Sequence, residues 1–196
     1  MGPMSSNELL TTLTTDEQQQ LLDVAAASIW SGLRTGRPLE VSADEFSTAL
    51  RQPRATFVTL RIGEALRGCM GSLAANVPLV CDVARNAYAA AFRDPRFPPV
   101  SAAELDSLEI HISVLSPPEP LPFASEADLL SKIRPGVDGL ILYEDGHRGT
   151  LLPAVWDHIR DPGEFLAHLK LKAGLPADYW SETIRIERYT AESIPA

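Results

Sequence analysis

The sequence is poor in cysteine, in basic side chains and in long apolar runs. With only Cys69 and Cys81, it lacks the cysteine framework of a disulfide-stapled protein, so both should be free thiols. A formal net charge of −9 argues against nucleic acid and against an anionic membrane surface, because both need clustered Lys and Arg. No apolar run is long enough to cross a bilayer, and residues 1–13 lack the features of a signal peptide. We therefore expect a cytoplasmic protein.

The four histidines also lack a metal-binding pattern. His111, His147, His158 and His168 show neither His-x-x-x-His spacing nor a Cys-x-x-Cys partner. The sequence therefore predicts no metal and no other cofactor. Its 196 residues, of which 45% are hydrophobic, predict a single compact domain around one core.

Segments whose apolar residues have helical spacing alternate along the chain with segments that have the spacing of a strand. Helical spacing and capping residues predict helices between Thr14 and Gly36, after Pro78, and between Asp161 and Gly174, with another helix start at Ser101. Alternation and β-branched residues predict strands over 56–62, 65–73, 108–115, 137–143, 149–152 and 181–190. Because hairpins join several of these strands, the pattern predicts an α+β protein with mainly antiparallel sheet flanked by helices.

The stretch from Leu66 to Leu73 combines a guanidinium, a thiol and two glycines. Strict alternation places Arg67 and Cys69 on one face with Cα atoms about 7 Å apart. At an effective dielectric of ~20 such a charge favours a thiolate by about 2.4 kcal/mol, against about 0.6 kcal/mol in open water. Gly68 and Gly71 indicate a bulge, a bend or a closely approaching group. The residues leave two interpretations open: a reactive thiol beside an anion-binding arginine, or a buried structural cysteine in a bent strand, with Arg67 capping carbonyls.

"LRGCMGSL" (66–73) resembles the Leu-Arg-Gly-Cys-Ile-Gly-Thr-Leu signature of the AMMECR domain family. Further matches follow in order: "FVTL" (57–60), "AAAFRDPRFPPV" (89–100), "LEIHISVLSPPEP" (108–120), "GVDGLILYEDGHRGTLLPAVW" (136–156) and "EFLAHLKLKAGLPADYW" (164–180). Met70 and Ser72 stand where the signature has Ile and Thr, and Ala154 stands where many members have Gln or Ser. We assign the AMMECR domain to residues 8–192 and expect residues 1–7 to be a disordered N-terminal segment.

The resemblance implies a two-layer α/β fold of two subdomains with antiparallel sheet, and an exposed cleft at the Arg-Gly-Cys motif. The members most similar to this chain are called AmmeMemoRadiSam system protein A. They are associated with a Memo-like protein and a radical S-adenosylmethionine enzyme, so these two are the implied protein partners. The family supplies no established reaction.

The resemblance favours the functional interpretation of the thiol. Cys69 and Arg67 are the predicted catalytic residues, and the predicted substrate-binding residues are Gly68, Gly71, Ser72, Arg96 and His111. Backbone N–H groups near the glycines would stabilise charge. His111 is either a surface histidine or, if its strand lies near the hairpin, the group that takes a proton from Cys69. Arg96 is either a second positive charge or the ion-pair partner of Asp94.

Two functions remain open from the sequence. In one, Cys69 holds or processes a small anionic or carbonyl compound. In the other, the protein is a non-catalytic accessory module for the two implied protein partners.

Overall fold

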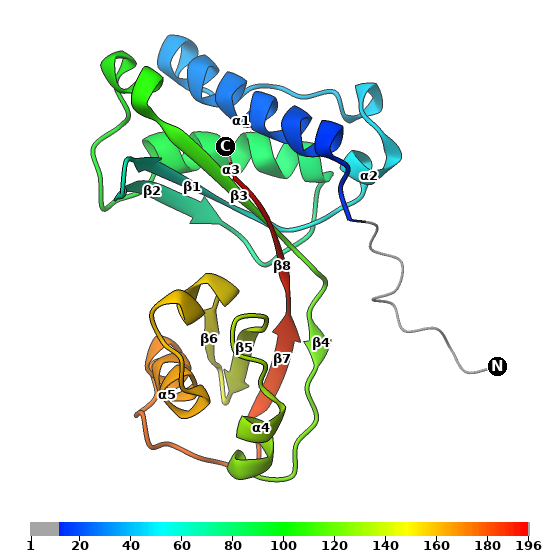
Figure 1. Cartoon of the computed structure of the whole chain (residues 1–196), viewed down its shortest axis with the longest axis vertical. Helices are drawn as coiled ribbons and strands as arrows, with labels where there is room; N and C mark the ends of the chain where they lie inside the picture. The colour runs from blue at the N-terminus through cyan, green and yellow to red at the C-terminus, as the bar shows by residue number, and fades with distance from the viewer. Residues whose placement is uncertain (1–11, 196) are drawn as a thin grey trace, which may run out of the picture. The chain divides into compact units, whose positions relative to one another are not determined.

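The computed structural model describes residues 12–195, which form two compact units (Figure 1). Of these residues, 12–116 and 192–195 belong to unit 1, and 117–191 belong to unit 2. The segment 1–7, predicted to be disordered, lies outside the described residues. Each unit has its own hydrophobic core, so the prediction of one core for the whole chain is wrong. The division into two subdomains implied by the family resemblance is confirmed.

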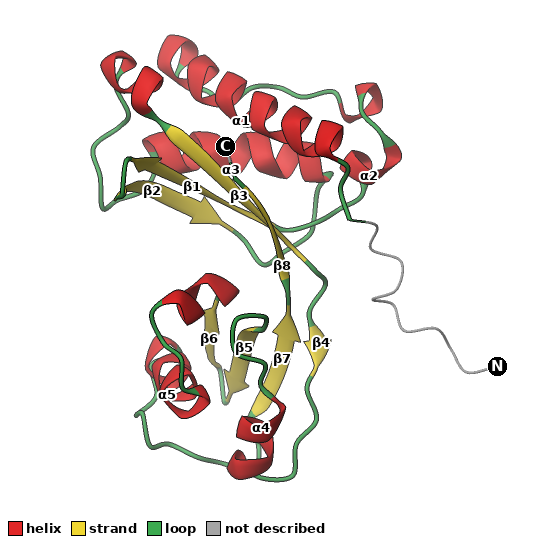
Figure 2. Ribbon diagram, viewed as in Figure 1, coloured by secondary structure: helices red, strands yellow, loops and turns green. Residues whose placement is uncertain are grey.

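Unit 1 places its helices on one face of a four-stranded sheet. Its helices are α1 (Thr15–Thr35), α2 (Thr48–Arg51) and α3 (Leu79–Phe92), with 3₁₀ helices at Ala43–Glu45 and Ala102–Ser107. Its strands are β1 (Thr56–Ile62), β2 (Ala65–Gly71), β3 (Glu109–Leu115) and β8 (Ala191–Ile194). The strand order is β2-β1-β3-β8, and β1 pairs antiparallel with β2 and β3. Figure 2 shows α1 and α3 side by side against this sheet.

The core of unit 1 follows from the alternation predicted for its strands. Val58, Leu60, Ile110 and Ile112 are buried and belong to the same cluster as the apolar residues of α1 and α3. The residues between them therefore lie on the opposite sheet face, away from both helices. This second face carries the polar side chains that matter below.

The local signals for α1 are confirmed. Thr14 and Glu17 form a capping box, in which the Glu17 backbone N–H donates to the Thr14 hydroxyl and the Glu17 carboxylate accepts from the Thr14 N–H. Gly36 ends the helix in a left-handed conformation, with φ of 70°. Such a conformation strains any residue with a Cβ, which explains a glycine at this position.

Unit 2 contains the second four-stranded sheet. Its elements are β4 (Glu119–Pro120), α4 (Glu126–Lys132), β5 (Gly139–Glu144), β6 (His147–Leu151), a 3₁₀ helix at Pro153–Asp157, α5 (Pro162–Lys172) and β7 (Arg185–Tyr189). The strand order is β4-β7-β5-β6, and β5 pairs antiparallel with both β6 and β7. Helix α5 packs against β5 and β6. The α+β class with mainly antiparallel sheet is therefore confirmed in both units.

The last predicted strand, 181–190, needs a correction. Its first residues form a turn, because the Thr183 backbone N–H donates to the Ser181 hydroxyl at 3.1 Å and the two hydroxyls contact each other. The remainder is β7, and the chain then continues into β8, which joins the sheet of unit 1. Alternation alone does not show that one extended segment serves two sheets. Within residues 12–195, no helix has the length and apolar character needed to cross a membrane.

Candidate functional site

A β-bulge at Arg67 decides which way Cys69 faces. The hairpin begins with Ile62 opposite Ala65 and Arg61 opposite Leu66, but Leu60 then lies opposite Gly68. Arg67 is thus an extra residue on β2, and every later residue changes sides relative to an unbulged hairpin.

Without the bulge Cys69 would lie opposite Val58 and would face the core. With it, Cys69 lies opposite Thr59 on the face away from the helices. The predicted alternation is confirmed from Gly68 to Gly71 but is wrong at Leu66, which lies on the same face as Cys69 instead of on the face of Gly68.

Thr59 supplies the hydrogen bond to the sulfur. Its hydroxyl donates to Cys69 Sγ at 3.3 Å, and the Cys69 side chain is half-buried. A hydroxyl donor stabilises a thiolate more than a thiol, because hydrogen bonds to charged acceptors are stronger. The sulfur is therefore neither sealed in the core nor fully solvated. Both cysteines are free thiols, as predicted.

Asp94 fixes the backbone of Cys69 from the opposite side. The Cys69 N–H donates to Asp94 Oδ2 at 2.9 Å, and the Asp94 side chain is only 2% exposed. Arg96 donates to the same carboxylate through Nε at 2.9 Å and through Nη2 at 2.7 Å. The ion pair with Asp94 is therefore confirmed, and the Arg96 guanidinium also donates to the Cys69 carbonyl at 3.4 Å. Its role as a second positive charge for an anion stays a prediction.

The ion pair changes the protonation of both partners. The hydrogen bonds from Arg96, followed by that from the Cys69 backbone, hold the pKa of Asp94 well below its usual range despite the opposing effect of burial. The pKa of Arg96 is raised, mainly by its hydrogen bond to Asp94 and in small part by attraction to the Cys69 sulfur. Arg96 is 55% exposed, so its remaining guanidinium surface is open to solvent and to a ligand.

Arg67 is held by a different set of contacts. Its Nε donates to Glu104 Oε1 at 2.6 Å, and its Nη2 donates to the Pro99 carbonyl at 3.3 Å. The hydrogen bond from Arg67, followed by those from the Ser101 backbone N–H and hydroxyl, lowers the pKa of Glu104 to about 2. The guanidinium is 12% exposed, so Arg67 ties the 94–104 segment to β2. The arginine that contacts the Cys69 residue is Arg96, which sequence spacing did not single out as the primary charge.

The two glycines meet neighbouring backbone and ring atoms. A Cβ on Gly68 would collide with the carbonyl oxygen of Ala90 in α3, and one on Gly71 would collide with the Phe57 ring and the Thr56 carbonyl. The predicted bulge and close approach are therefore both present. The Ser72 N–H donates to the Thr56 carbonyl at 3.1 Å, towards β1. Because successive N–H groups of an antiparallel strand point to opposite sides, the Gly71 N–H points away from β1.

Within residues 12–195, neither Ser72 nor His111 forms a hydrogen bond or an ion pair with Cys69. The Ser72 hydroxyl accepts the Ala74 N–H at 2.9 Å and shapes the turn after β2. His111 on β3 and Cys69 on β2 both lie opposite Thr59 on β1, the strand between them. The backbones of β2 and β3 are therefore separated by two strand spacings, together about 10 Å. The His111 Nε2 is 3.9 Å from Glu109. Proton transfer from Cys69 to His111 stays a prediction, and it needs an intermediate group.

Sequence reasoning missed the roles of Thr59 and Glu104. Thr59 is the polar residue of the "FVTL" stretch, but its partner across the hairpin cannot be assigned until the bulge is placed. Glu104 was recognisable as the third residue of a capping box with Ser101, which the structure confirms, but not as the partner of Arg67. Among the described residues, no three His, Cys, Asp or Glu side chains are grouped to hold a metal ion.

The fold and site together define an α+β protein of two antiparallel sheets with a half-buried thiol on the helix-free face of one of them. The AMMECR1 family profile matches residues 22–194. The chain belongs to the AMMECR1 family.

The similarity to its relatives extends over nearly the whole chain. A protein of Methanothermobacter thermautotrophicus is 42% identical over 184 residues, covering 92% of this chain and 94% of the relative. A protein of Thermotoga maritima is 38% identical over 162 residues, covering 82% of this chain and 88% of its own. The crystal structure of uncharacterized protein PH0010 from Pyrococcus horikoshii matches with a TM-score of 0.80 and 38% identity, over 88% of both chains. The family and the fold are thereby shown.

Proposed function

We propose that the Cys69 site binds a small anionic carbonyl compound and holds it as a reversible covalent adduct. The observation that carries the proposal is the half-buried Cys69 sulfur, which accepts a hydrogen bond from the Thr59 hydroxyl. The guanidinium of Arg96, which contacts the Cys69 carbonyl, stays exposed beside it. An accessible thiol beside a positive charge is the setting in which cysteine acts as a nucleophile.

The chemical step uses no oxidant or cofactor. Cys69 Sγ forms a bond to the carbonyl carbon, and the electron pair of the C=O π bond moves to the oxygen. The oxygen takes up the proton that the thiol gives up, so the product is a hemithioacetal. Arg96 orients the anionic group of the compound, and the outward Gly71 N–H is placed to stabilise the developing oxyanion.

The other predicted residues support this site from outside it. Arg67 holds the 94–104 segment through Glu104, and Asp94 holds both Arg96 and the Cys69 N–H. The Cys69 N–H is therefore committed to Asp94 and is not the oxyanion donor. His111 lies on the same sheet face, opposite Thr59, and would contact a larger compound, whereas Ser72 shapes the turn after β2.

Carbon-13 NMR with labelled glyoxylate tests the proposal, because this probe carries a carbonyl and a carboxylate in one small molecule. The wild-type protein should give a protein-bound hemithioacetal signal that Cys69→Ser abolishes and Cys81→Ser retains. Arg96→Gln should weaken the adduct with glyoxylate more than that with acetaldehyde, which has no charge for Arg96 to orient. An adduct that persists in Cys69→Ser, or no adduct in folded wild-type protein, would refute the proposal.

A separate surface supports the second candidate, an accessory module for a Memo-like protein or a radical S-adenosylmethionine enzyme. Trp30 of α1 is 53% exposed. Hollows of about 270 Å³ and 530 Å³ lie beside it, lined in part by Ile29, Leu105 and Leu39. An exposed tryptophan beside apolar hollows is typical of a binding hot spot.

Co-purification with each partner distinguishes this second function from the first. If the surface around Trp30 binds the partner, Trp30→Ala should lose it and Cys69→Ser should retain it, because serine has nearly the shape of cysteine. Retention by Trp30→Ala would contradict the docking role of this surface.

A further inference from the structure

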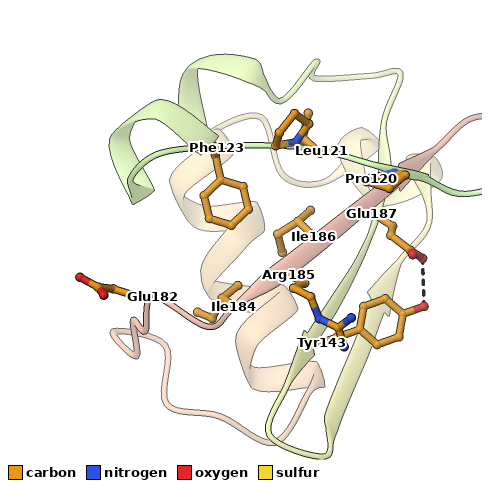
Figure 3. A pocket seen from close by; sticks show the side chains of 10 residues that line it. Pro120, Leu121, Phe123, Tyr143, Glu182, Ile184, Arg185, Ile186 and Glu187 are labelled. Atoms are coloured by element: carbon orange, nitrogen blue, oxygen red, sulfur yellow. Dashed lines mark hydrogen bonds between the residues drawn. The ribbon is translucent and has the colours of Figure 1, made fainter.

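A cavity of about 560 Å³ opens in unit 2, far along the chain from the thiol (Figure 3). The segment that follows β4 forms one wall, and side chains of β7 and β5 form the other. Its volume lies within the range of roughly 300–1,000 Å³ that is usual for small-molecule sites. The cavity shares no residue with the Cys69 site, so it needs a separate explanation.

One half of the cavity is apolar and held in place. Phe123, Pro120 and Pro122 provide the exposed apolar surface of this half, while the side chains of Leu121, Ile184 and Ile186 are buried in the core beneath it. Figure 3 shows the Phe123 ring directed towards β7. The Leu121 N–H donates to the Ile186 carbonyl at 2.9 Å, which fixes the wall to the strand. The Phe123 ring also packs on Trp180, with ring centroids 5.7 Å apart. An apolar group can therefore enter a surface that is already formed.

The other half carries one positive and one negative side chain. Arg185 pairs across the sheet with Tyr143, and its guanidinium carbon lies 5.7 Å from the centroid of that ring. Glu187 accepts the Tyr143 hydroxyl at 3.0 Å. Within residues 12–195, neither Arg185 nor Glu187 forms an ion pair. Both charges lie on the same face of β7, two residues apart.

This charge pattern selects among classes of ligand. A purely anionic ligand would be repelled by the Glu187 carboxylate, which lies in the charged half of the cavity. A purely apolar ligand would leave Arg185 and Glu187 unpaired as it excludes water from them. A ligand with a carboxylate, an ammonium group and an apolar body satisfies all three features.

We infer that this cavity binds a free α-amino acid with an apolar or aromatic side chain. Its carboxylate pairs with Arg185, whose fork of donors suits that group, and its ammonium group pairs with Glu187. Its side chain packs against Phe123 in the apolar half. The inference is independent of the function proposed for Cys69.

Calorimetric titration of the full chain with L-phenylalanine tests the inference, with two matched analogues as controls. 3-Phenylpropionate lacks the ammonium group, and phenethylamine lacks the carboxylate, while both keep the aromatic body. L-Phenylalanine should bind at least about tenfold more tightly than either analogue. Equal binding of all three compounds, or no binding of L-phenylalanine or L-leucine up to about 10 mM, would overturn the inference.

Three variants locate the site. Arg185→Gln and Glu187→Gln should each weaken L-phenylalanine at least about tenfold. Arg148→Gln is the matched control, because Arg148 stacks on the same Tyr143 ring at 5.4 Å but does not line the cavity. Undiminished binding by folded Arg185→Gln would place the amino acid elsewhere. If Arg185→Gln does not fold, the comparison of the three compounds on wild-type protein still tests whether both the carboxylate and the ammonium group are needed for binding. Cys69→Ser should bind L-phenylalanine as the wild type does.

Discussion

Replacing Thr59 by valine removes the hydroxyl that donates to Cys69 Sγ and keeps a β-branched side chain of similar size on β1. A hydrogen bond contributes about 0.5–1.5 kcal/mol to a neutral acceptor and about 1.5–3 kcal/mol to a charged one, so its loss disfavours the thiolate by about 1 kcal/mol. Since 1.4 kcal/mol is a factor of ten, the alkylation rate of Cys69 should fall about fivefold.

Intact-protein mass spectrometry with iodoacetamide measures this rate directly. Cys81→Ser serves as the common background, so that Cys69 is the only thiol in the reaction. Thr59→Ser is the matched control, because it keeps the hydroxyl and should react within about twofold of the parent. The reasoning is refuted if folded Thr59→Val reacts as fast as the parent, since the hydroxyl would then have no influence on the sulfur.

Three further outcomes follow from the contacts around the thiol. Asp94→Asn should lower the free energy of unfolding by about 1–3 kcal/mol in urea titrations, because Arg96 loses its charged partner; unchanged stability would contradict this. Gly68→Ala should cost about 1–3 kcal/mol by the same assay, because its methyl group meets the Ala90 carbonyl, and wild-type stability would refute the close approach. The pKa of Glu104 is lowered from 4.5 to about 2, so its carboxylate stabilises the folded state fully at pH values above 4.5, its pKa in the unfolded chain. That contribution should be lost as the pH falls from 4.5 towards 2, and Glu104→Gln should reduce this part of the acid dependence.

Local sequence signals predicted the longer elements well. The capping box at Thr14 and Gly36 delimit α1, and alternation identifies β1 and β3. The β5–β6 hairpin is also confirmed, with a tight turn at Asp145 and Gly146, both at positive φ. Short elements such as α2, β4 and α4 were not predicted, because a few residues carry too little periodicity.

The candidate site was predictable in composition but not in geometry. The motif identified Cys69, and the glycines indicated a bulge or close approach, but neither signal gave the position of the bulge. A single extra residue at Arg67 turns Cys69 from the core face to the helix-free face and places it opposite Thr59. Contacts between segments distant in sequence, such as Arg67 with Glu104, depend on tertiary packing that no local pattern encodes.

The central claim is that Cys69 is a reachable and reactive sulfur. Its most direct test is the rate of iodoacetamide labelling of the two cysteines in native wild-type protein, resolved by peptide mass mapping. Cys69 should label faster than Cys81, the half-buried thiol of α3 that lies 3.7 Å from the Val41 carbonyl. Labelling of Cys69 at the same rate as Cys81, or only after denaturation, would contradict the account.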